Sequence, residues 1–190
     1  MEKRPQHPTG RVTRIVLTGP ECTGKSTLSR QLADYYHTRF IPEYARDYIA
    51  GLCRPYTYDD VLHIANTQRD QAHSIDEGQN GIIFLDTYLI ITKFWFKVVF
   101  NRYPDWIDRE LAGNFIDLYL LCDTSIPWTS DEVRENGGEM RVKLYELYKR
   151  ELERLGCRYT VITGLGPDRF NMAVQAVNSF LEDSAREQHH

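Results

Sequence analysis

The sequence predicts an α/β fold in which a parallel sheet of five strands is covered on both faces by helices. Short apolar runs alternate along the 190 residues with longer segments of helical periodicity. The apolar runs show little polar alternation, as expected for strands with both faces buried. Because crossover connections between parallel strands are almost always right-handed, this order predicts three layers, with the sheet in the middle.

Five apolar runs are the candidate strands. The first ends at a glycine-rich loop, and the second stops near Pro42. Ligands bind such sheets at the carboxyl ends of the strands, and the chemically suggestive residues of this sequence follow those ends. The five runs are residues 14–19, 39–44, 81–86, 116–122 and 158–164.

Helical segments follow each of these strands. Thr57 and Asp60 have the spacing of a capping box at the start of one helix, and Gly156 closes another. We expect one domain over residues 13–183, with a flexible tail at 1–12 and a second tail at 184–190. The expected helices are residues 25–37, 57 to about 77, 87–100, 141–156 and 169–181.

Composition argues against several partners. The chain has 27 acidic and 23 basic residues, a net charge of −4 and no run of Lys or Arg, so nucleic acid and anionic membranes are not expected partners. No apolar run approaches the ~20 residues that cross a bilayer, and the polar N-terminus lacks a signal-peptide core. The four cysteines are too widely spaced to suggest zinc, so we expect a cytoplasmic protein with reduced thiols. The sequence makes no prediction of oligomeric state.

Residues 19–26, GPECTGKS, match the phosphate-binding pattern G-x-x-x-x-G-K-[ST] in full. Gly19 and Gly24 permit backbone angles that turn successive N–H groups toward a phosphate at the helix N-terminus. Lys25 is placed to reach the β- and γ-phosphates of ATP, and the Ser26 hydroxyl to bind Mg²⁺. The alternative is a glycine-rich turn without a ligand. With a strand before it and a helix after it, the pattern predicts a P-loop NTPase.

Acidic side chains follow two other strands. Asp86 ends the third strand, where it would hold Mg²⁺ directly or through water, or a substrate hydroxyl. The alternative is that Asp86 or Thr87 caps the next helix. Glu43 follows the second strand and is a candidate general base, while Arg46 is a candidate to hold substrate or a phosphoryl oxygen. The alternative for this pair is a surface ion pair.

The segment 126–141, IPWTSDEVRENGGEMR, is rich in turn formers and charges. We expect a lid that closes over ATP, with Arg134 and Arg141 neutralising the transferring phosphoryl group. The alternative is a solvated loop with surface arginines. Trp128 is either a satellite core residue or a stacking platform for a flat ligand, for which a pyridinium ring is a good partner.

Two absences favour transfer to a small acceptor over a motor or a switch. No glutamate follows Asp86 to activate water, and no guanine-reading N-K-x-D motif occurs. Residues 56–60 and Gln68 are weak candidates for lining the acceptor pocket. We interpret the aromatic residues 94–96 as core packing.

Together these motifs resemble the ribosylnicotinamide kinase domain of the NadR-type proteins, a nucleoside- and nucleotide-kinase-like P-loop family. The resemblance covers about residues 14–176 and rests on GPECTGKSTL, PEYAR, FLDT, and IPW followed by Asp131, Arg134 and Arg141. It implies a kinase that uses ATP and Mg²⁺ to phosphorylate the ribose 5′-hydroxyl of nicotinamide riboside, giving nicotinamide mononucleotide.

The resemblance also implies roles for the matching residues. Trp128 would stack on the nicotinamide ring, and either Glu43 or Asp86 would be the base. The catalytic set would be Lys25, Glu43, Asp86, Arg134 and Arg141. The ATP-binding set would be Gly19, Glu21, Cys22, Thr23, Gly24, Lys25, Ser26 and Thr27. The substrate-binding set would be Glu43, Arg46, Asp86, Trp128 and Asp131, with Ser26 and Asp86 as metal ligands.

The sequence departs from the family pattern at two positions. Glu132 follows Asp131 where glycine is common, and Tyr88 stands where an acidic residue is common. Two alternatives therefore stay open: a kinase for another nucleoside or small alcohol, and a regulatory ATP-binding protein whose lid docks a partner. No H-x-G-H motif occurs, so we expect another protein to carry out any adenylyl transfer.

Overall fold

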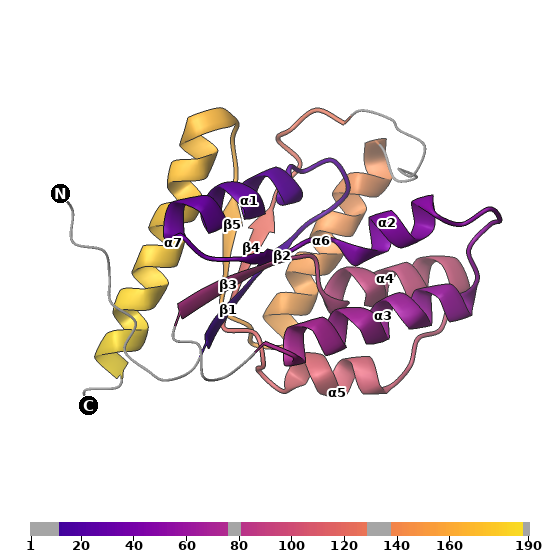
Figure 1. Cartoon of the computed structure of the whole chain (residues 1–190). Coiled ribbons are helices and arrows are strands. Elements are labelled where there is room, and N and C mark those ends of the chain that lie inside the picture. The colour runs from indigo at the N-terminus through magenta and orange to yellow at the C-terminus, as the bar shows by residue number, and fades with distance from the viewer. Residues whose placement is uncertain (1–11, 76–80, 129–137, 188–190) are drawn as a thin grey trace.

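A computed structural model describes residues 12–75, 81–128 and 138–187. Its centre is a parallel sheet of five strands in the order β2-β3-β1-β4-β5 (Figure 1). The predicted fold class is confirmed, because helices cover both faces of this sheet. The strands are β1 (Val12–Thr18), β2 (Phe40–Ile41), β3 (Gly81–Asp86), β4 (Leu118–Cys122) and β5 (Tyr159–Ile162).

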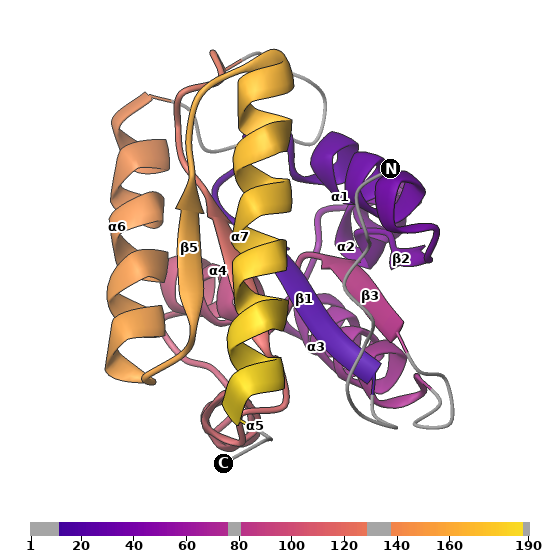
Figure 2. The same ribbon diagram turned by 90° about the vertical axis from the view of Figure 1, so that its left-hand side faces the viewer.

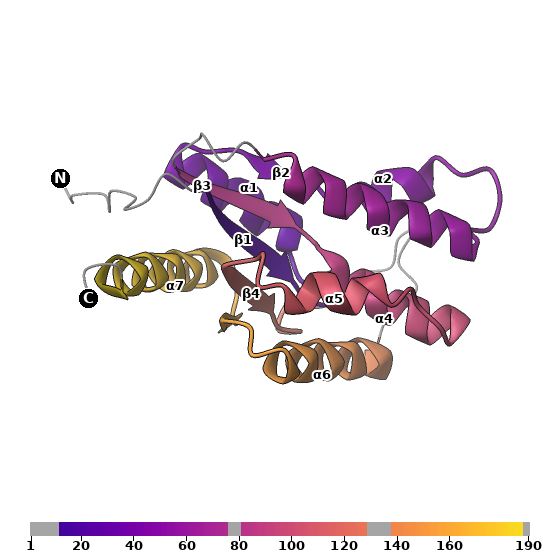
Figure 3. The ribbon, with the colours of Figure 1, turned by 90° about the horizontal axis from the view of Figure 1, so that it is seen from below.

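Seven helices occur in the described residues. Helices α1 and α7 lie on one face of the sheet, and α3, α4, α5 and α6 on the other (Figures 1 and 2). Seen from below, α4, α5 and α6 lie together beside the sheet (Figure 3). The helices are α1 (Lys25–Tyr36), α2 (Tyr44–Ala50), α3 (Tyr58–His73), α4 (Leu89–Phe100), α5 (Trp106–Ala112), α6 (Gly138–Arg154) and α7 (Gly166–Glu187).

Alternate residues of the central strand serve the two cores. Ile15 and Leu17 of β1 pack in the cluster formed with α1 and α7, whereas Val16 packs in the cluster formed with α3 to α6. All three are fully buried. This is why the strand shows no polar alternation in the sequence, since both faces of a parallel strand are covered.

The structure differs from the predicted elements at several boundaries. The second strand ends at Ile41, because Pro42 cannot donate a ladder hydrogen bond and a helix that was not predicted, α2, begins at Tyr44. The short helix α5 was also missed. The last helix runs to Glu187, so residues 184–187 are helical and do not form the predicted tail. The helix predicted to begin at Thr87 begins at Leu89.

The predicted capping box at the start of α3 is confirmed. The Asp60 N–H donates to Thr57 Oγ1 at 3.4 Å, and the Thr57 N–H donates to the Asp60 carboxylate at 2.7 Å. Arg54 and Tyr48 also donate to Asp60, which holds the pKa of that carboxyl far below its usual range. This network joins α2 to α3. Within the described residues, no helix has the length and apolar character needed to cross a membrane.

Candidate functional site

The glycine-rich loop connects β1 to α1 at the carboxyl edge of the sheet, and its two pattern glycines are required by its shape. Gly19 has φ +140°, and a Cβ there would lie 2.4 Å from the carbonyl oxygen of Cys122. Gly24 has φ +70°, and a Cβ there would lie 2.7 Å from Ile126 Cδ1. Both positions combine a backbone conformation that disfavours a side chain with the close approach of β4 or the residues after it.

The loop lysine folds back onto the loop. Lys25 Nζ donates to the carbonyl oxygens of Gly19 at 3.0 Å and Pro20 at 2.9 Å, and the side chain is largely buried. Thr23 Oγ1 also donates to the Pro20 carbonyl at 2.8 Å. The ammonium group therefore lies across the loop, within the part of the molecule where the sequence predicted phosphate binding.

Two carboxylates lie close to this lysine. Asp86 is 2% exposed and lies close enough to Ser26 for the hydroxyl to lower its pKa, so the two predicted metal ligands are neighbours. Burial raises the pKa of Asp86, while Lys25 and Ser26 oppose that shift. Burial likewise raises the pKa of Glu43, with Lys25 and Arg46 opposing the rise and Asp86 adding to it. The structure thus brings together the predicted residues from three separate strand ends.

Asp86 Oδ1 is buried and has no hydrogen-bond partner among the described residues. A buried carboxylate oxygen left without a donor is costly unless a cation or another donor completes the site. Mg²⁺ prefers a hard oxygen environment in which the protein supplies one or two ligands, and phosphates and water supply the rest. The Ser26 hydroxyl and the Asp86 carboxylate fit that description.

The residue after Asp86 has an unusual backbone. Thr87 has φ +80°, although a β-branched residue strongly disfavours that region. Its N–H donates to the carbonyl of Leu17 at 3.0 Å, which holds the turn against β1. The alternative in which Thr87 or Asp86 caps the next helix is not observed, because Tyr88 is the N-cap residue and no side chain caps it.

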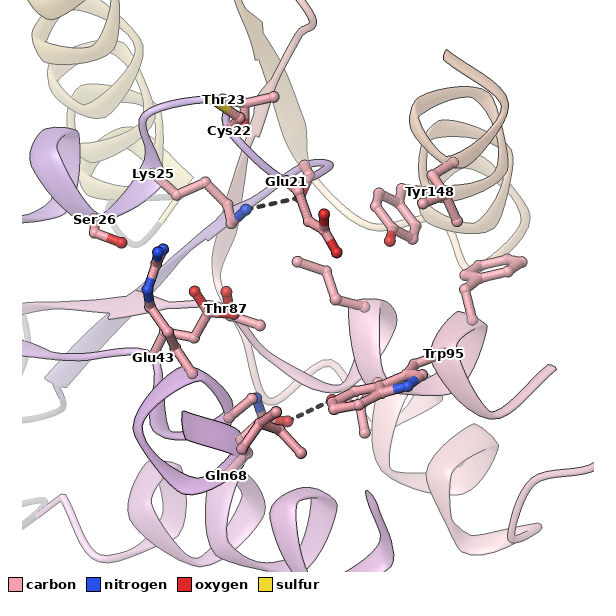
Figure 4. A pocket seen from close by; sticks show the side chains of 18 of the residues that line it. Glu21, Cys22, Thr23, Lys25, Ser26, Glu43, Gln68, Thr87, Trp95 and Tyr148 are labelled. Atoms are coloured by element: carbon pink, nitrogen blue, oxygen red, sulfur yellow. Dashed lines mark hydrogen bonds between the residues drawn. The ribbon is translucent and has the colours of Figure 1, made fainter. Parts of the chain in front are cut away.

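A cavity of about 460 Å³ extends from the glycine-rich loop to α4. Figure 4 shows Lys25 and Ser26 at one end, Glu43 and Thr87 between, and Gln68, Trp95 and Tyr148 at the other end. The lining therefore changes from polar to aromatic and aliphatic along its length. The far end is lined by Ile49, Tyr56, Gln68, Ile91, Thr92, Phe94, Trp95, Val98, Val99, Leu144 and Tyr148.

One amide group stands out in this far compartment. Gln68 is 4% exposed, and its Oε1 accepts a hydrogen bond from Thr92 Oγ1 at 2.6 Å. Its Nε2 has no partner in the described parts of the chain. Gln68, which the sequence offered as a candidate for lining the acceptor pocket, lines this cavity and has a buried amide donor without a partner in the described residues.

Trp95 adds to one prediction. Phe94 and Phe96 are core residues as expected. Trp95 packs against the same core but is only partly buried and also lines the cavity, with its ring 5.0 Å from that of Tyr56 in an edge-to-face contact. The signal was present in the sequence. Helix α4 is apolar around most of its circumference, so a second face had to meet something other than the core, and Ile91, Trp95 and Val98 share that face.

Three predicted site residues do not line the cavity. Asp86 is buried behind it against Ser26. Trp128 is partly buried outside the lining, with its Nε1 unpartnered within the described residues. Arg141 is buried, and its guanidinium donates to the backbone carbonyls of Glu21, Cys22 and Ile126 instead of pointing into the cavity. Asp131, Arg134 and most of the predicted lid lie outside the described residues.

Sequence reasoning missed Arg169, which follows β5 in the first turn of α7. Its guanidinium is 5% exposed and donates to the carbonyl of Thr23 in the glycine-rich loop at 2.6 Å. The available signal was its position after the carboxyl end of a strand, where the other site residues also lie.

A phosphate-loop motif between the first strand and helix of a parallel sheet, with an adjacent Ser–Asp pair, defines a P-loop NTPase. Residues 14–169 match the family model described as an AAA domain, so the chain belongs to that family. The match covers most of the chain.

Comparisons with individual proteins confirm the resemblance to NadR. The chain is 27% identical over 139 residues to the trifunctional NAD biosynthesis/regulator protein NadR of Salmonella typhimurium, a match that covers 71% of this chain and 34% of that protein. The crystal structure of NadR protein in complex with NR superposes with a TM-score of 0.66 at 25% identity, covering 90% of this chain and 52% of that one.

A nucleoside kinase shares the fold alone. The deoxyadenosine kinase of M. mycoides, solved with dCMP and dCDP, has a TM-score of 0.62 at 15% identity and covers 88% of this chain and 99% of that one. The chain thus spans about a third of the curated relatives and almost the whole length of this kinase. The kinase-like fold class is confirmed, and the resemblance to the NadR-type P-loop domain is confirmed with it.

Proposed function

We propose that this chain is an ATP-dependent kinase that phosphorylates the ribose 5′-hydroxyl of nicotinamide riboside. The observation that carries the proposal is the continuous cavity that joins the phosphate loop to an aromatic compartment, with Glu43 at the junction. A nucleoside with its sugar at Glu43 would direct its hydroxyl toward the loop and its base toward Trp95. The relationship to NadR, seen in complex with NR, supports the choice of acceptor.

The loop and its lysine bind and orient the triphosphate. The N–H groups of the loop and the N-terminus of α1 favour an anion, and Lys25 exchanges its two carbonyl partners for phosphate oxygens. Phosphoryl transfer of this kind is accelerated by alignment and charge stabilisation, without a covalent enzyme intermediate.

Ser26 and Asp86 would hold Mg²⁺ in this proposal. The bound ion would supply positive charge that offsets the negative charge of the phosphates during transfer. The chain's own contribution is to keep the Ser26 hydroxyl and the Asp86 carboxylate adjacent and largely sheltered from water.

We assign Glu43 as the general base. Asp86 is buried and does not line the cavity, whereas Glu43 lines it between the loop and the aromatic compartment. Its raised pKa makes the carboxylate a better proton acceptor than an exposed glutamate. Arg46, which also lines the cavity, is placed to orient the sugar or a phosphoryl oxygen.

The aromatic compartment suits a flat cationic base. The pyridinium ring of the riboside is attracted by the face of an indole, at about 1 kcal/mol or more when water is excluded. The Tyr88 departure does not disturb this compartment. The Tyr88 ring packs in the core and its hydroxyl donates to Glu110 at 3.0 Å, so this side chain does not line the cavity.

The test is a turnover assay with Mg-ATP against nicotinamide riboside and a panel of common nucleosides, with Lys25→Ala as the blank. Selective formation of nicotinamide mononucleotide is expected. No turnover of the riboside by a protein that binds Mg-ATP would contradict the proposed acceptor.

The second candidate is a kinase for another nucleoside. The buried Gln68 amide favours it, because an amide pairs well with the hydrogen-bonding edge of a purine or pyrimidine. The same assay separates the two candidates, since turnover of one nucleoside in preference to the riboside would select it.

A further inference from the structure

Each carbonyl group of residues 19–24 in the glycine-rich loop accepts a hydrogen bond. The carbonyls of Gly19 and Pro20 accept from Lys25, and that of Gly24 accepts from the Leu28 N–H at 3.0 Å. The remaining carbonyls, of residues 21–23, accept from two buried guanidinium groups. The bonds from these two guanidinium groups do not involve Lys25, so they can persist when Lys25 turns to a phosphate.

Arg141 of α6 holds two of these three peptide groups. Its Nε donates to the Glu21 carbonyl at 3.0 Å, and one terminal nitrogen donates to the Cys22 carbonyl at 2.9 Å. The same nitrogen donates to the Ile126 carbonyl at 2.7 Å, just after β4. The planar, multidentate donor set of arginine allows one side chain to fix three backbone carbonyls.

Arg169 of α7 holds the third of these peptide groups, that of Thr23. One terminal nitrogen donates to the Thr23 carbonyl at 2.6 Å, and the other donates to Ile162 and Gly164 carbonyls at 3.3 Å. The Asp123 carboxylate lies 3.6 Å from the Arg169 guanidinium and partly compensates its buried positive charge. Arg169 is thereby anchored to the ends of β4 and β5, which do not belong to the loop.

Peptide geometry connects these bonds to the ligand side. In a trans peptide the carbonyl and the following N–H point in opposite directions. Holding the carbonyls of residues 21–23 outward therefore turns the N–H groups of Cys22, Thr23 and Gly24 the other way. Successive N–H groups that converge in this manner form an anion-binding nest.

We propose that Arg141 and Arg169 are positioning residues that set the phosphate cradle before the nucleotide arrives. Neither touches the ligand; each acts through the carbonyls that it holds. This replaces the catalytic role predicted for Arg141. The inference rests on the proposed binding of a nucleotide by the loop, and it is independent of which acceptor is phosphorylated.

Calorimetric titration with Mg-ADP tests the positioning role of the two arginines directly, because ADP binding requires no acceptor. Arg141→Gln and Arg169→Gln are each expected to weaken ADP binding by tenfold or more. The matched controls are Arg150→Gln on α6 and Arg186→Gln on α7, both exposed arginines on the same helices, and they are expected to change binding by less than twofold. Circular dichroism checks that each variant is folded.

Kinetics separate positioning from a general structural role. In the riboside assay the glutamine variants are expected to raise KM for ATP while leaving KM for the acceptor within twofold. Should a glutamine variant not fold, Arg141→Lys and Arg169→Lys keep the charge but lose the guanidinium, and at least threefold weaker ADP binding is expected.

The outcomes distinguish this inference from the proposed function. Folded glutamine or lysine variants that bind ADP within twofold of the parent overturn the positioning role. A parent protein that binds ADP but does not phosphorylate the riboside overturns only the proposed acceptor. A parent that binds no ADP overturns both.

Discussion

Asp86 combines burial, a raised pKa and an unpartnered oxygen, so its charge destabilises the nucleotide-free protein. An acid whose pKa is raised on folding contributes stability at low pH that is lost as the pH rises through the folded-state pKa. Asp86→Asn is therefore expected to stabilise the protein by about 1 kcal/mol at neutral and higher pH, while removing phosphoryl transfer.

Urea unfolding of both proteins as a function of pH measures this effect. The gain should vanish below the ordinary Asp value of 3.8, where both side chains are uncharged. An asparagine variant less stable than the parent at neutral pH would show that the carboxylate has structural partners beyond Ser26.

Gln68 gives a second expectation for a single residue. Replacing it with leucine removes the buried donor at similar volume, so a ligand group that it hydrogen-bonds would be left unpaired at a cost of about 1–3 kcal/mol. We expect Gln68→Leu to lower kcat/KM for the acceptor by tenfold to a hundredfold with KM for ATP unchanged. Gln71→Leu, three residues along α3 and outside the cavity lining, is the matched control.

At the scale of elements, α4 has one face buried in the core and a second, partly exposed face on the cavity. Phe94 and Phe96 pack in the core, while Trp95 faces the cavity together with Ile91 and Val98. Trp95→Leu is expected to raise KM for the riboside about tenfold, since both an aromatic face and packing area are lost. Trp128→Leu is the comparison, because Trp128 is the residue that the sequence predicted to stack on nicotinamide.

The two tryptophan variants distinguish between two positions for the base of the acceptor. A large effect at Trp95 with little effect at Trp128 supports the compartment described by the structure. The reverse result would restore the sequence prediction and place the base near the residues that follow β4. Steady-state kinetics with the riboside as the varied substrate measures both.

The elements that sequence reasoning predicted well are those with strong local signals. The apolar strands, the glycine-rich loop and the Thr57–Asp60 capping box each depend on neighbouring residues. The short helices α2 and α5 were missed because seven residues carry too little periodicity to distinguish a helix from a turn.

The site was predictable where a motif carried it and unpredictable where tertiary packing decided. Lys25, Ser26, Glu43 and Asp86 come together because the carboxyl ends of parallel strands share one edge. Whether an arginine side chain points into the cavity or toward the backbone of the loop cannot be predicted from a motif. The sequence did not predict that Arg141 donates to the carbonyls of Glu21 and Cys22, since its position relative to the loop depends on how α6 docks.

For the molecule as a whole, the cavity predicts how activity depends on pH. Glu43 must be ionised to accept the proton of the hydroxyl, and burial raises its pKa above the ordinary value of 4.5. As the pH falls, kcat/KM for the acceptor is expected to decline at a higher pH than an exposed glutamate would allow. Opposing contributions from Lys25 and Arg46 limit that shift, so removal of either positive charge should move the decline to still higher pH.

Measuring kcat/KM between about pH 5 and pH 9 for the parent and for Arg46→Gln tests the assignment. Glutamine keeps a hydrogen-bonding group but removes the charge, so the acid limb should shift upward without a change in the alkaline limb. Glu43→Gln should lose turnover by a hundredfold or more and keep its affinity for ADP. If the acid limb is the same in Arg46→Gln as in the parent, the titrating group is neither Glu43 nor Asp86, because Arg46 lowers the pKa of both carboxyls.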